Sequence, residues 1–266
     1  MNDRTQDVQE IQETPKRELL LTAADVTVRE GAESITLAVR KKGIHGILGP
    51  VGAGKGELLR RLAGIVPTEG EILLVGERVT PEATAIRKKI GYVPECPRLD
   101  GTMTVSETLE LAGAVKGVDP ERRTRQVREA LELMGLDGVK KRLVARLGDR
   151  ERWRLALGMA LVGNPELLLL ENPFSGIPEE EAQGRRELFA MLGRVKTVLM
   201  TTATFSEAKA LCEDVTILSD GAVLASGSFE ELEETLARND GETTLEEIYR
   251  QLCAVCQKAD REEVDE

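Results

Sequence analysis

A glycine-rich segment early in the chain places the strongest constraint on what the chain can fold into. Residues 49–55 read Gly-Pro-Val-Gly-Ala-Gly-Lys, follow the apolar run 44–48 and open a helical pattern from about Gly54 to Ala63. This spacing fits G-x-x-x-x-G-K, in which the glycines let backbone N–H groups turn inward around a phosphate and the lysine reaches its outer oxygens. The N-terminus of the helix adds the positive end of its dipole. The segment therefore predicts a phosphate-binding loop in an α/β domain.

The residues that follow the lysine depart from the usual loop. Gly56 stands where a serine or threonine gives a hydroxyl to Mg²⁺, and Glu57 adds a carboxylate to the helical turn that meets the phosphates. Two like charges this close cost on the order of 1–4 kcal/mol, depending on the effective dielectric. We predict weakened binding of ATP and doubtful binding of Mg²⁺; the alternative is a loop that keeps its shape and holds no nucleotide. The predicted nucleotide-binding residues are Gly49, Gly52, Gly54, Lys55, Gly56 and Glu57.

Apolar periodicity outlines the rest of the fold. Residues 167–170 are four leucines, the unbroken run of a central parallel strand that is buried on both faces. Residues 34–40 instead alternate apolar and polar side chains, as in a strand with one buried face. Helical spacing from Val105 to Val144 indicates a separate helical insert. Further strands are expected at 18–29, 44–48, 71–75, 91–93, 198–200 and, as a hairpin, 215–218 with 223–226; further helices are expected at 155–162, 229–237 and 244–258.

Composition limits the classes of partner. The chain has 266 residues and a formal net charge of −11, so its surface repels nucleic acid and anionic headgroups, and we expect no nucleic-acid partner. Residues 1–17 are polar, which predicts no signal peptide. No apolar run approaches the roughly 20 residues of a membrane helix. Any association with a membrane is therefore expected to come through a partner.

Cysteine usage suits a reducing compartment, because the chain contains only 4 cysteines. Cys253 and Cys256 form a lone C-x-x-C in an expected tail helix, where their thiols would share one face. A zinc site would need two more ligands, and His45 is the only histidine of the chain. We favour two packed small side chains over a metal or redox site.

The order and spacing of further segments resemble the ATP-binding subunits of ABC transporters, over nearly all of residues 18–250. The landmarks are 91–95 (Gly-Tyr-Val-Pro-Glu) as the Q-loop, 147–151 (Leu-Gly-Asp-Arg-Glu) where the LSGGQ signature belongs, 163–173 as the Walker B strand and its approach, 175–178 as the D-loop, 201–203 (Thr-Thr-Ala) at the H-loop, and 244–249 as a tail common in subunits that serve drug and polysaccharide exporters. The phosphate-binding loop then corresponds to Walker A. The resemblance implies an α/β P-loop NTPase of the ABC ATPase type, with a mostly parallel central sheet, an antiparallel β subdomain and an inserted helical subdomain.

The resemblance also implies a division of the chain into three parts. We predict a flexible lead-in at 1–17, and an ABC-type ATP-binding domain at 18–240 with the helical subdomain inserted at about 96–150. A C-terminal helical tail at 241–266 follows.

Four landmark positions that the family uses for hydrolysis are changed. In the family, the Walker B strand ends in an aspartate that orders Mg²⁺ and a glutamate that acts as general base, whereas Glu171 and Asn172 stand here. Glu171 can still reach a metal with its longer arm, but the amide of Asn172 cannot accept a proton from water. Ala203 replaces the H-loop histidine, and Pro178 replaces the D-loop aspartate. We therefore predict that no catalytic residue is intact. The adenine-stacking aromatic of the family is also absent, because residues 18–48 contain no Phe, Tyr or Trp.

The signature and the Q-loop differ as well. Gly148, Asp149 and Arg150 occupy the positions at which a serine and two glycines close over the γ-phosphate held by the partner subunit. Side chains there block the close backbone approach that glycine permits, although Arg150 offers an alternative phosphate ligand. Glu95 replaces the Q-loop glutamine, a change that is common in the exporter-type branch. Its carboxylate either binds Mg²⁺ or is a solvated loop group.

These changes together predict a catalytically degenerate ATP-binding-cassette subunit of a membrane transporter, with weak or no ATP hydrolysis. The expected partners are a membrane permease subunit and a second ABC ATPase subunit, as a heterodimer or a homodimer. The expected location is the cytoplasmic face of the membrane, reached through the permease. Two alternatives stay open: an unorthodox but active ABC ATPase that drives export, and a soluble ABC-type protein without a permease.

Overall fold

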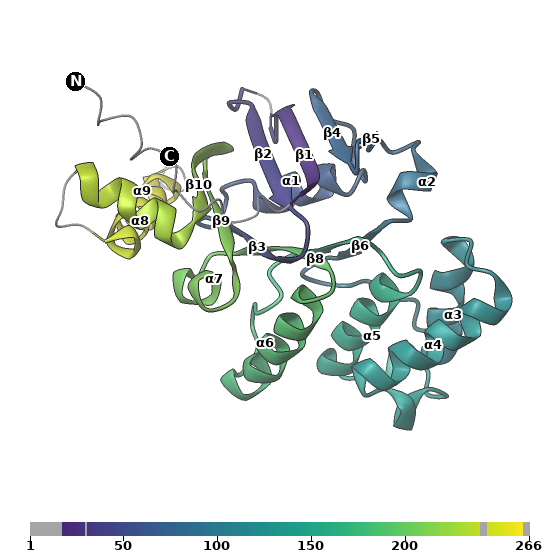
Figure 1. The fold of residues 1–266 in the computed structure, drawn as a ribbon. Helices are drawn as coiled ribbons and strands as arrows, with labels where there is room; N and C mark the ends of the chain where they lie inside the picture. The colour runs from purple at the N-terminus through teal and green to yellow at the C-terminus, as the bar shows by residue number, and fades with distance from the viewer. Residues whose placement is uncertain (1–17, 30, 240–243, 263–266) are drawn as a thin grey trace, which may run out of the picture.

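The computed structural model describes residues 18–29, 31–239 and 244–262, and is built around two sheets (Figure 1). The larger sheet contains, in spatial order, β10 (Ala222–Ser228), β9 (Asp214–Ser219), β3 (Gly43–Leu48), β8 (Thr197–Thr202), β7 (Leu167–Leu170) and β6 (Ile90–Val93). Only β10 runs antiparallel to its neighbour in this sheet. The smaller sheet is antiparallel and contains β2 (Ile35–Arg40), β1 (Leu19–Val26), β4 (Glu71–Leu74) and β5 (Glu77–Arg78). The predicted fold class is confirmed.

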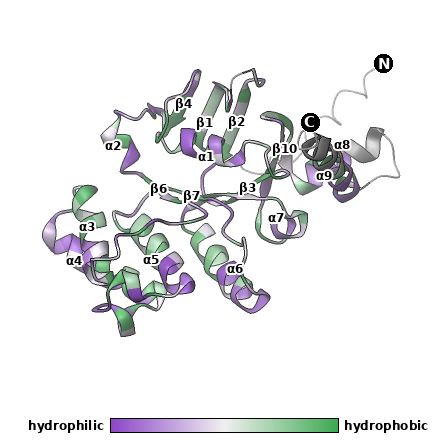
Figure 2. Cartoon of the chain, turned by 180° about the vertical axis from the view of Figure 1, so that it is seen from behind, coloured by the Kyte–Doolittle hydropathy of each residue, from purple (hydrophilic) through white to green (hydrophobic). Residues whose placement is uncertain are grey.

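Helices lie on both sides of the larger sheet and at its edges (Figure 1). The helices of the described residues are α1 (Lys55–Leu62), α2 (Thr84–Arg87), α3 (Val105–Val115), α4 (Pro120–Met134), α5 (Asp149–Leu161), α6 (Glu179–Gly193), α7 (Phe205–Leu211), α8 (Phe229–Asn239) and α9 (Leu245–Glu262), with 3₁₀ turns at Asp137–Val139 and Val144–Arg146. In Figure 1, α1 lies between the two sheets, whereas α3 to α6 lie on the opposite side of the larger sheet. Figure 2 shows hydrophilic residues on the outer turns of α4 and α6 and hydrophobic residues along the strands.

The core divides into two clusters because the central strand is buried on both sides. Leu167 and Leu169 pack with α1 and the antiparallel sheet, whereas Leu168 and Leu170 pack with the helical layer of α3 to α6. All four leucines have no exposed surface. The period of two in a strand explains this division, since successive side chains point to opposite faces. The prediction of a doubly covered central strand at 167–170 is confirmed.

The helical layer begins in the segment expected to form the helical subdomain. Thr104 caps α3 in a reciprocal pair with Glu107, and Asp119 caps α4, which starts at Pro120 and ends at Gly135 in the left-handed conformation. The helix expected at 155–162 begins earlier, at Asp149, so the signature segment forms its first turn. We keep the division at about 96–150, and the tail from 241, as a proposal. The lead-in 1–17 lies outside the described residues.

The sequence patterns did not predict two helices on this side of the larger sheet, α6 and α7. The stretch that forms α6 opens with three glutamates, and Arg185 interrupts its apolar stripe of Ala182, Phe189 and Leu192. The guanidinium of Arg185 is buried because it stacks on the ring of Trp153, 3.8 Å from the ring centroid, and donates to the carbonyl oxygen of Pro173. Only two residues of the short helix α7 are buried, which is too few to give a clear period.

The buried histidine of β3 predicts a pH dependence of stability. His45 contacts the hydroxyl of Thr216 through Nε2 at 2.9 Å, and burial, helped by the charge of Arg40, lowers its pKa from 6.5 to about 4. Between pH 6.5 and pH 4 the imidazole of His45 binds a proton in the unfolded chain but stays neutral in the folded chain, so the free energy of unfolding falls as the pH drops towards 4. Between pH 7 and pH 5 the wild type should lose about 2 kcal/mol more than His45→Gln in urea unfolding. Equal losses would show that His45 titrates normally in the fold.

Candidate functional site

A cavity of about 590 Å³ opens at the carboxyl ends of β3, β7 and β8. Parallel strands end at the same edge of a sheet, which is where α/β folds bind ligands. The cavity is lined by residues 51–57, Arg60, Glu95, Glu171, Asn172, 174–176, 202–204 and Glu207. It therefore brings together the phosphate-binding loop and the residues predicted at the Q-loop, the end of the Walker B strand and the H-loop.

The phosphate-binding loop turns tightly between β3 and α1. Gly54 has a φ of 88°, and a Cβ on Gly49 would lie 2.3 Å from the carbonyl oxygen of Leu218. The Nζ of Lys55 is buried and donates to the carbonyl oxygens of Gly49 at 2.7 Å and of Pro50 at 2.6 Å. Burial lowers the pKa of Lys55. The lysine therefore closes its own loop and has to turn outward to reach a phosphate.

The space beside Gly56 is filled by a carboxylate from the neighbouring strand end. A Cβ on residue 56 would lie 2.2 Å from Oε1 of Glu171. A serine or threonine at position 56 and the observed position of Glu171 therefore exclude each other. Glu171 is held there by its own backbone, whose N–H donates to the carbonyl oxygen of Val93 at 2.9 Å.

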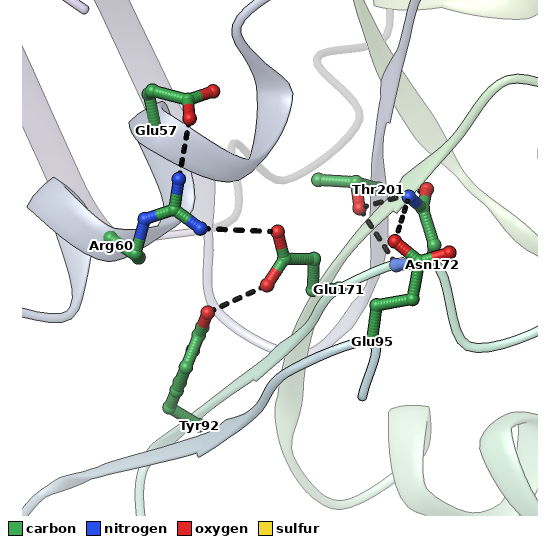
Figure 3. A network of polar contacts seen from close by, with 7 residues as sticks. All are labelled: Glu57, Arg60, Tyr92, Glu95, Glu171, Asn172 and Thr201. Carbon is green, nitrogen blue, oxygen red and sulfur yellow. Dashed lines mark hydrogen bonds and ion pairs between the residues drawn. The ribbon is translucent and has the colours of Figure 1, made fainter. Parts of the chain in front are cut away.

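Both carboxylate oxygens of Glu171 have protein donors (Figure 3). The hydroxyl of Tyr92 donates to Oε2 at 2.7 Å, and Nη1 of Arg60 lies 3.5 Å from Oε1. Burial and this hydrogen bond raise the pKa of Tyr92, so the phenol stays a neutral donor. The guanidinium of Arg60 also pairs with Glu57, one turn earlier in α1. Glu57, Arg60, Glu171 and Tyr92 thus form one chain of contacts across the cavity wall, which we call the Arg60 network.

Asn172 connects the Walker B position to the Q-loop and to β8 (Figure 3). Its Nδ2 donates to Oε2 of Glu95 at 3.1 Å, and its backbone N–H donates to Oγ1 of Thr201 at 2.9 Å. Its φ of 40° lies in the left-handed region, which asparagine tolerates better than most residues. The carboxamide therefore occupies the base position with its N–H₂ group turned to a carboxylate.

The end of β8 carries small side chains at the cavity. Ala203 is exposed, and its carbonyl oxygen accepts a hydrogen bond from the hydroxyl of Tyr249 on α9 at 2.8 Å. Thr202 donates to Oε2 of Glu207 at 2.6 Å. No imidazole reaches the cavity in the described part of the chain, because the single histidine, His45, is buried in β3.

The signature residues lie in an adjacent cavity of about 440 Å³, not in the first one. Asp149 and Arg150 line it together with Glu95, Asn172 and Pro178. Gly148 is the N-cap of α5, where its N–H donates to the carboxylate of Glu151 at 3.1 Å. Asp149 and Arg150 are exposed on the first turn of that helix.

The residues present do not fit an ordinary Mg²⁺ site. Position 56 offers no hydroxyl, and Oε1 of Glu171, the oxygen that fills its place, faces the cation of Arg60. Among the residues that the structure describes, no group of three or more His, Cys, Asp or Glu is placed to hold a metal. The predicted metal role of Glu171 therefore has no support in the observed contacts.

A family model described as "ABC transporter" matches residues 32–175, more than half of the chain. The chain belongs to the ABC transporter family. It is 33% identical over 196 residues to the Nod factor export ATP-binding protein I of Burkholderia lata, which covers 73% of this chain and 64% of that protein. It is 32% identical over 209 residues to the daunorubicin resistance ATP-binding protein DrrA3 of Streptomyces coeruleorubidus, covering 77% and 65%. This ABC chain thus spans less than two thirds of the length of either relative.

Solved structures agree with the fold of this ABC domain. An ATP-binding subunit of an ABC transporter superposes with a TM-score of 0.77 at 22% identity, and the match covers 88% of this chain and 99% of that one. Identity at this level supports the fold alone. None of the helices in the described residues is long and apolar enough to cross a membrane.

The three cysteines whose side chains the structure describes, Cys96, Cys212 and Cys253, are not among the residues that line the first cavity. Cys96 is exposed at the adjacent cavity, and burial raises the pKa of the Cys212 thiol to about 12, so this thiol is unreactive near neutral pH. Cys253 is half-buried and packs against the core cluster that contains Tyr249. The side chain of Cys256 lies outside the described residues, so the expected sharing of one helix face stays a prediction.

Sequence reasoning gave no role to four residues that contact the site: Arg60, Tyr92, Thr201 and Glu207. Of these, Tyr92 and Thr201 lie within the segments predicted as the Q-loop and the H-loop. A signal existed for Arg60, which is four residues after Gly56 and so lies on the same face of α1. Tyr92 had a weaker one, since β6 pairs with β7 and places Tyr92 opposite Leu169, two residues before Glu171.

Proposed function

We propose that the chain is a catalytically degenerate ATP-binding subunit of a membrane transporter, which binds ATP at residues 49–57 and hydrolyses it weakly or not at all. The observation that carries this proposal is the contact of the Asn172 carboxamide with Glu95. A general base needs a free lone pair within reach of an attacking water. The position at which the family has its glutamate here donates N–H groups instead.

The other catalytic positions support the same conclusion. Ala203 offers only backbone atoms to a γ-phosphate, and Pro178 begins α6 without a side-chain cap. Removing one preorganised catalytic group typically lowers the rate by roughly 10²–10³, and such losses do not simply add. The chain's own Walker site therefore lacks a base, a phosphate-contacting imidazole and a metal hydroxyl.

The changed signature residues should also impair the nucleotide site of a partner subunit. Family members pair head to tail, so that the signature of one subunit completes the nucleotide site of the other. The side chains of Asp149 and Arg150 project where glycines would allow close backbone approach to a phosphate. We infer that even an intact ABC partner has no fully standard site beside this chain. A regulatory, scaffolding or slow-switching role follows.

We also propose that the chain works beside a permease at the cytoplasmic face of a membrane. The relatives named for Nod factor export and daunorubicin resistance favour an exporter. The surface near Glu95 and residues 96–108 would receive the permease, and this surface needs packing rather than catalysis.

A second candidate function is an unorthodox active ATPase, in which Glu95 acts as the base. The position of Glu95, 3.1 Å from the Asn172 amide, favours this alternative. A rate that depends on Lys55 and disappears in Glu95→Gln would establish it.

The permease proposal is tested by co-expression with a membrane subunit from the same gene neighbourhood. We expect the two proteins to co-elute after detergent extraction, and Arg98→Glu, at the proposed docking surface, to reduce recovery severalfold. Arg125→Glu is the matched control, since Arg125 is exposed on α4 and pairs with Glu129 within the same helix. Separate elution of the wild type would contradict the proposal and favour the soluble alternative.

A further inference from the structure

The Arg60 network occupies the region in which an ABC subunit ordinarily holds Mg²⁺. In the family, a hydroxyl after the Walker lysine and a Walker B carboxylate meet at the metal. Here the hydroxyl position is glycine, and Oε1 of Glu171 would lie 2.2 Å from a Cβ added there. The two substitutions therefore compensate each other in volume. Glycine at position 56 leaves a space, and the extra methylene of Glu171, relative to aspartate, carries its carboxylate into that space.

A cation of the protein faces this carboxylate. Arg60 follows Gly56 by four residues, so its side chain lies on the same helix face and points back towards the N-terminus of α1. Its Nη1 lies 3.5 Å from Oε1 of Glu171, whose side chain is only 13% exposed. A guanidinium keeps its charge at all accessible pH values and presents several donors in a fixed plane. Arg60 thus supplies a permanent positive charge at the carboxylate that would otherwise face a metal.

The guanidinium of Arg60 can exchange its second partner, a carboxylate, for a phosphate. Arg60 pairs there with Glu57, whose side chain is 48% exposed on the first turn of α1 and lines the cavity. Exposed ion pairs contribute at most about 1 kcal/mol, so Glu57 can turn to solvent at little cost. A phosphate oxygen in its place would receive a charge-assisted pair of hydrogen bonds. Arg60 would then bridge carboxylate and phosphate, as a divalent cation does in metal-dependent sites.

We propose, on the basis of the ATP binding proposed above, that this chain binds nucleoside triphosphate without a divalent cation, with the Arg60 guanidinium in the position of the metal. The affinity is weak, because four carboxylates and only two cations line the cavity. Added Mg²⁺ should strengthen nucleotide binding little, since the carboxylate of Glu171, which would be its ligand, already contacts Arg60 and the hydroxyl of Tyr92.

The test is equilibrium binding of mant-ATP, displaced by unlabelled ATP, in EDTA and in excess Mg²⁺. The wild type should give the same Kd within about twofold in both conditions. Arg60→Gln should weaken binding in EDTA by about 10–100-fold, the usual effect of removing a charged hydrogen-bond donor. Arg125→Gln, an arginine of α4 away from the cavity, should leave Kd unchanged. Thermal melts show that each variant is folded.

A double variant tests the exchange in the opposite direction. Gly56→Ser with Glu171→Asp removes the clash and returns a hydroxyl and a shorter carboxylate, so Mg²⁺ should then strengthen binding by at least about 10-fold. Wild-type binding that requires Mg²⁺, or an Arg60→Gln variant that binds normally in EDTA, would overturn metal-independent binding and leave the proposed function standing. No wild-type binding in either condition would overturn both.

Discussion

Purified wild-type chain and its Lys55→Ala variant are expected to release phosphate from ATP at the same background rate, within about twofold. Lys55 is the phosphate-contacting lysine of the Walker A pattern, and any genuine turnover at this site has to depend on it. The expected rate lies at least about a thousandfold below that of an ABC subunit with intact catalytic groups, because base, imidazole and metal hydroxyl are absent together.

The reason lies in the contacts at the end of β7. The Nδ2 of Asn172 donates to Glu95, and both oxygens of Glu171 are engaged by Tyr92 and Arg60. No group at the base position is free to take a proton from water. Asn172→Glu by itself is not expected to restore turnover, because the new carboxylate would face Glu95 and the imidazole would still be absent.

The Lys55→Ala variant measures the phosphate release that contaminating ATPases cause. Both proteins are purified in parallel and assayed by phosphate release at several chain concentrations, with melts to confirm that Lys55→Ala is folded. A wild-type rate more than 10-fold above that of Lys55→Ala would show true turnover. Glu95→Gln then tells whether Glu95 has replaced the base.

Phe189→Ala should lower the free energy of unfolding by about 3–5 kcal/mol. Phe189 has no exposed surface, and its ring centroid lies 5.9 Å from that of Trp153 and 5.5 Å from that of Phe174. The residue therefore packs α6 against the signature helix α5 and the loop that follows β7. Truncation leaves a large cavity and removes two favourable aromatic contacts.

Urea unfolding measures this loss, with Met191→Ala as the control on the same helix. Met191 is 46% exposed, so its truncation should change stability by no more than about 0.5 kcal/mol. A loss below about 1 kcal/mol in Phe189→Ala would mean that α6 does not pack on the core as described.

The sequence predicted the scaffold of the site better than its contacts. The run 167–170 and the loop 49–55 specify a buried parallel strand and a phosphate turn by local chemistry alone, and both are present. The helix α6 was missed because Arg185 interrupts the apolar period, and the burial of its guanidinium depends on Trp153, which is distant in sequence. No local pattern reports such a stacking partner.

The substitutions at the site illustrate the same limit. Taken one at a time, Gly56 and Glu171 read as two separate defects of a metal site. The fold places the Glu171 carboxylate in the space beside Gly56 and Arg60 against that carboxylate, so the two changes form one arrangement. Pairings between strand ends and helix faces depend on three-dimensional position, which a single sequence does not report.

We propose that this subunit holds ATP without cleaving it. The direct test is a single-turnover experiment, in which the chain in excess is mixed with α-labelled ATP and the bound nucleotide is recovered after several hours. We expect the label to return as ATP, with binding lost in Lys55→Ala. Conversion of the bound label to ADP in the wild type, but not in Lys55→Ala, would contradict the proposal that ATP is held uncleaved.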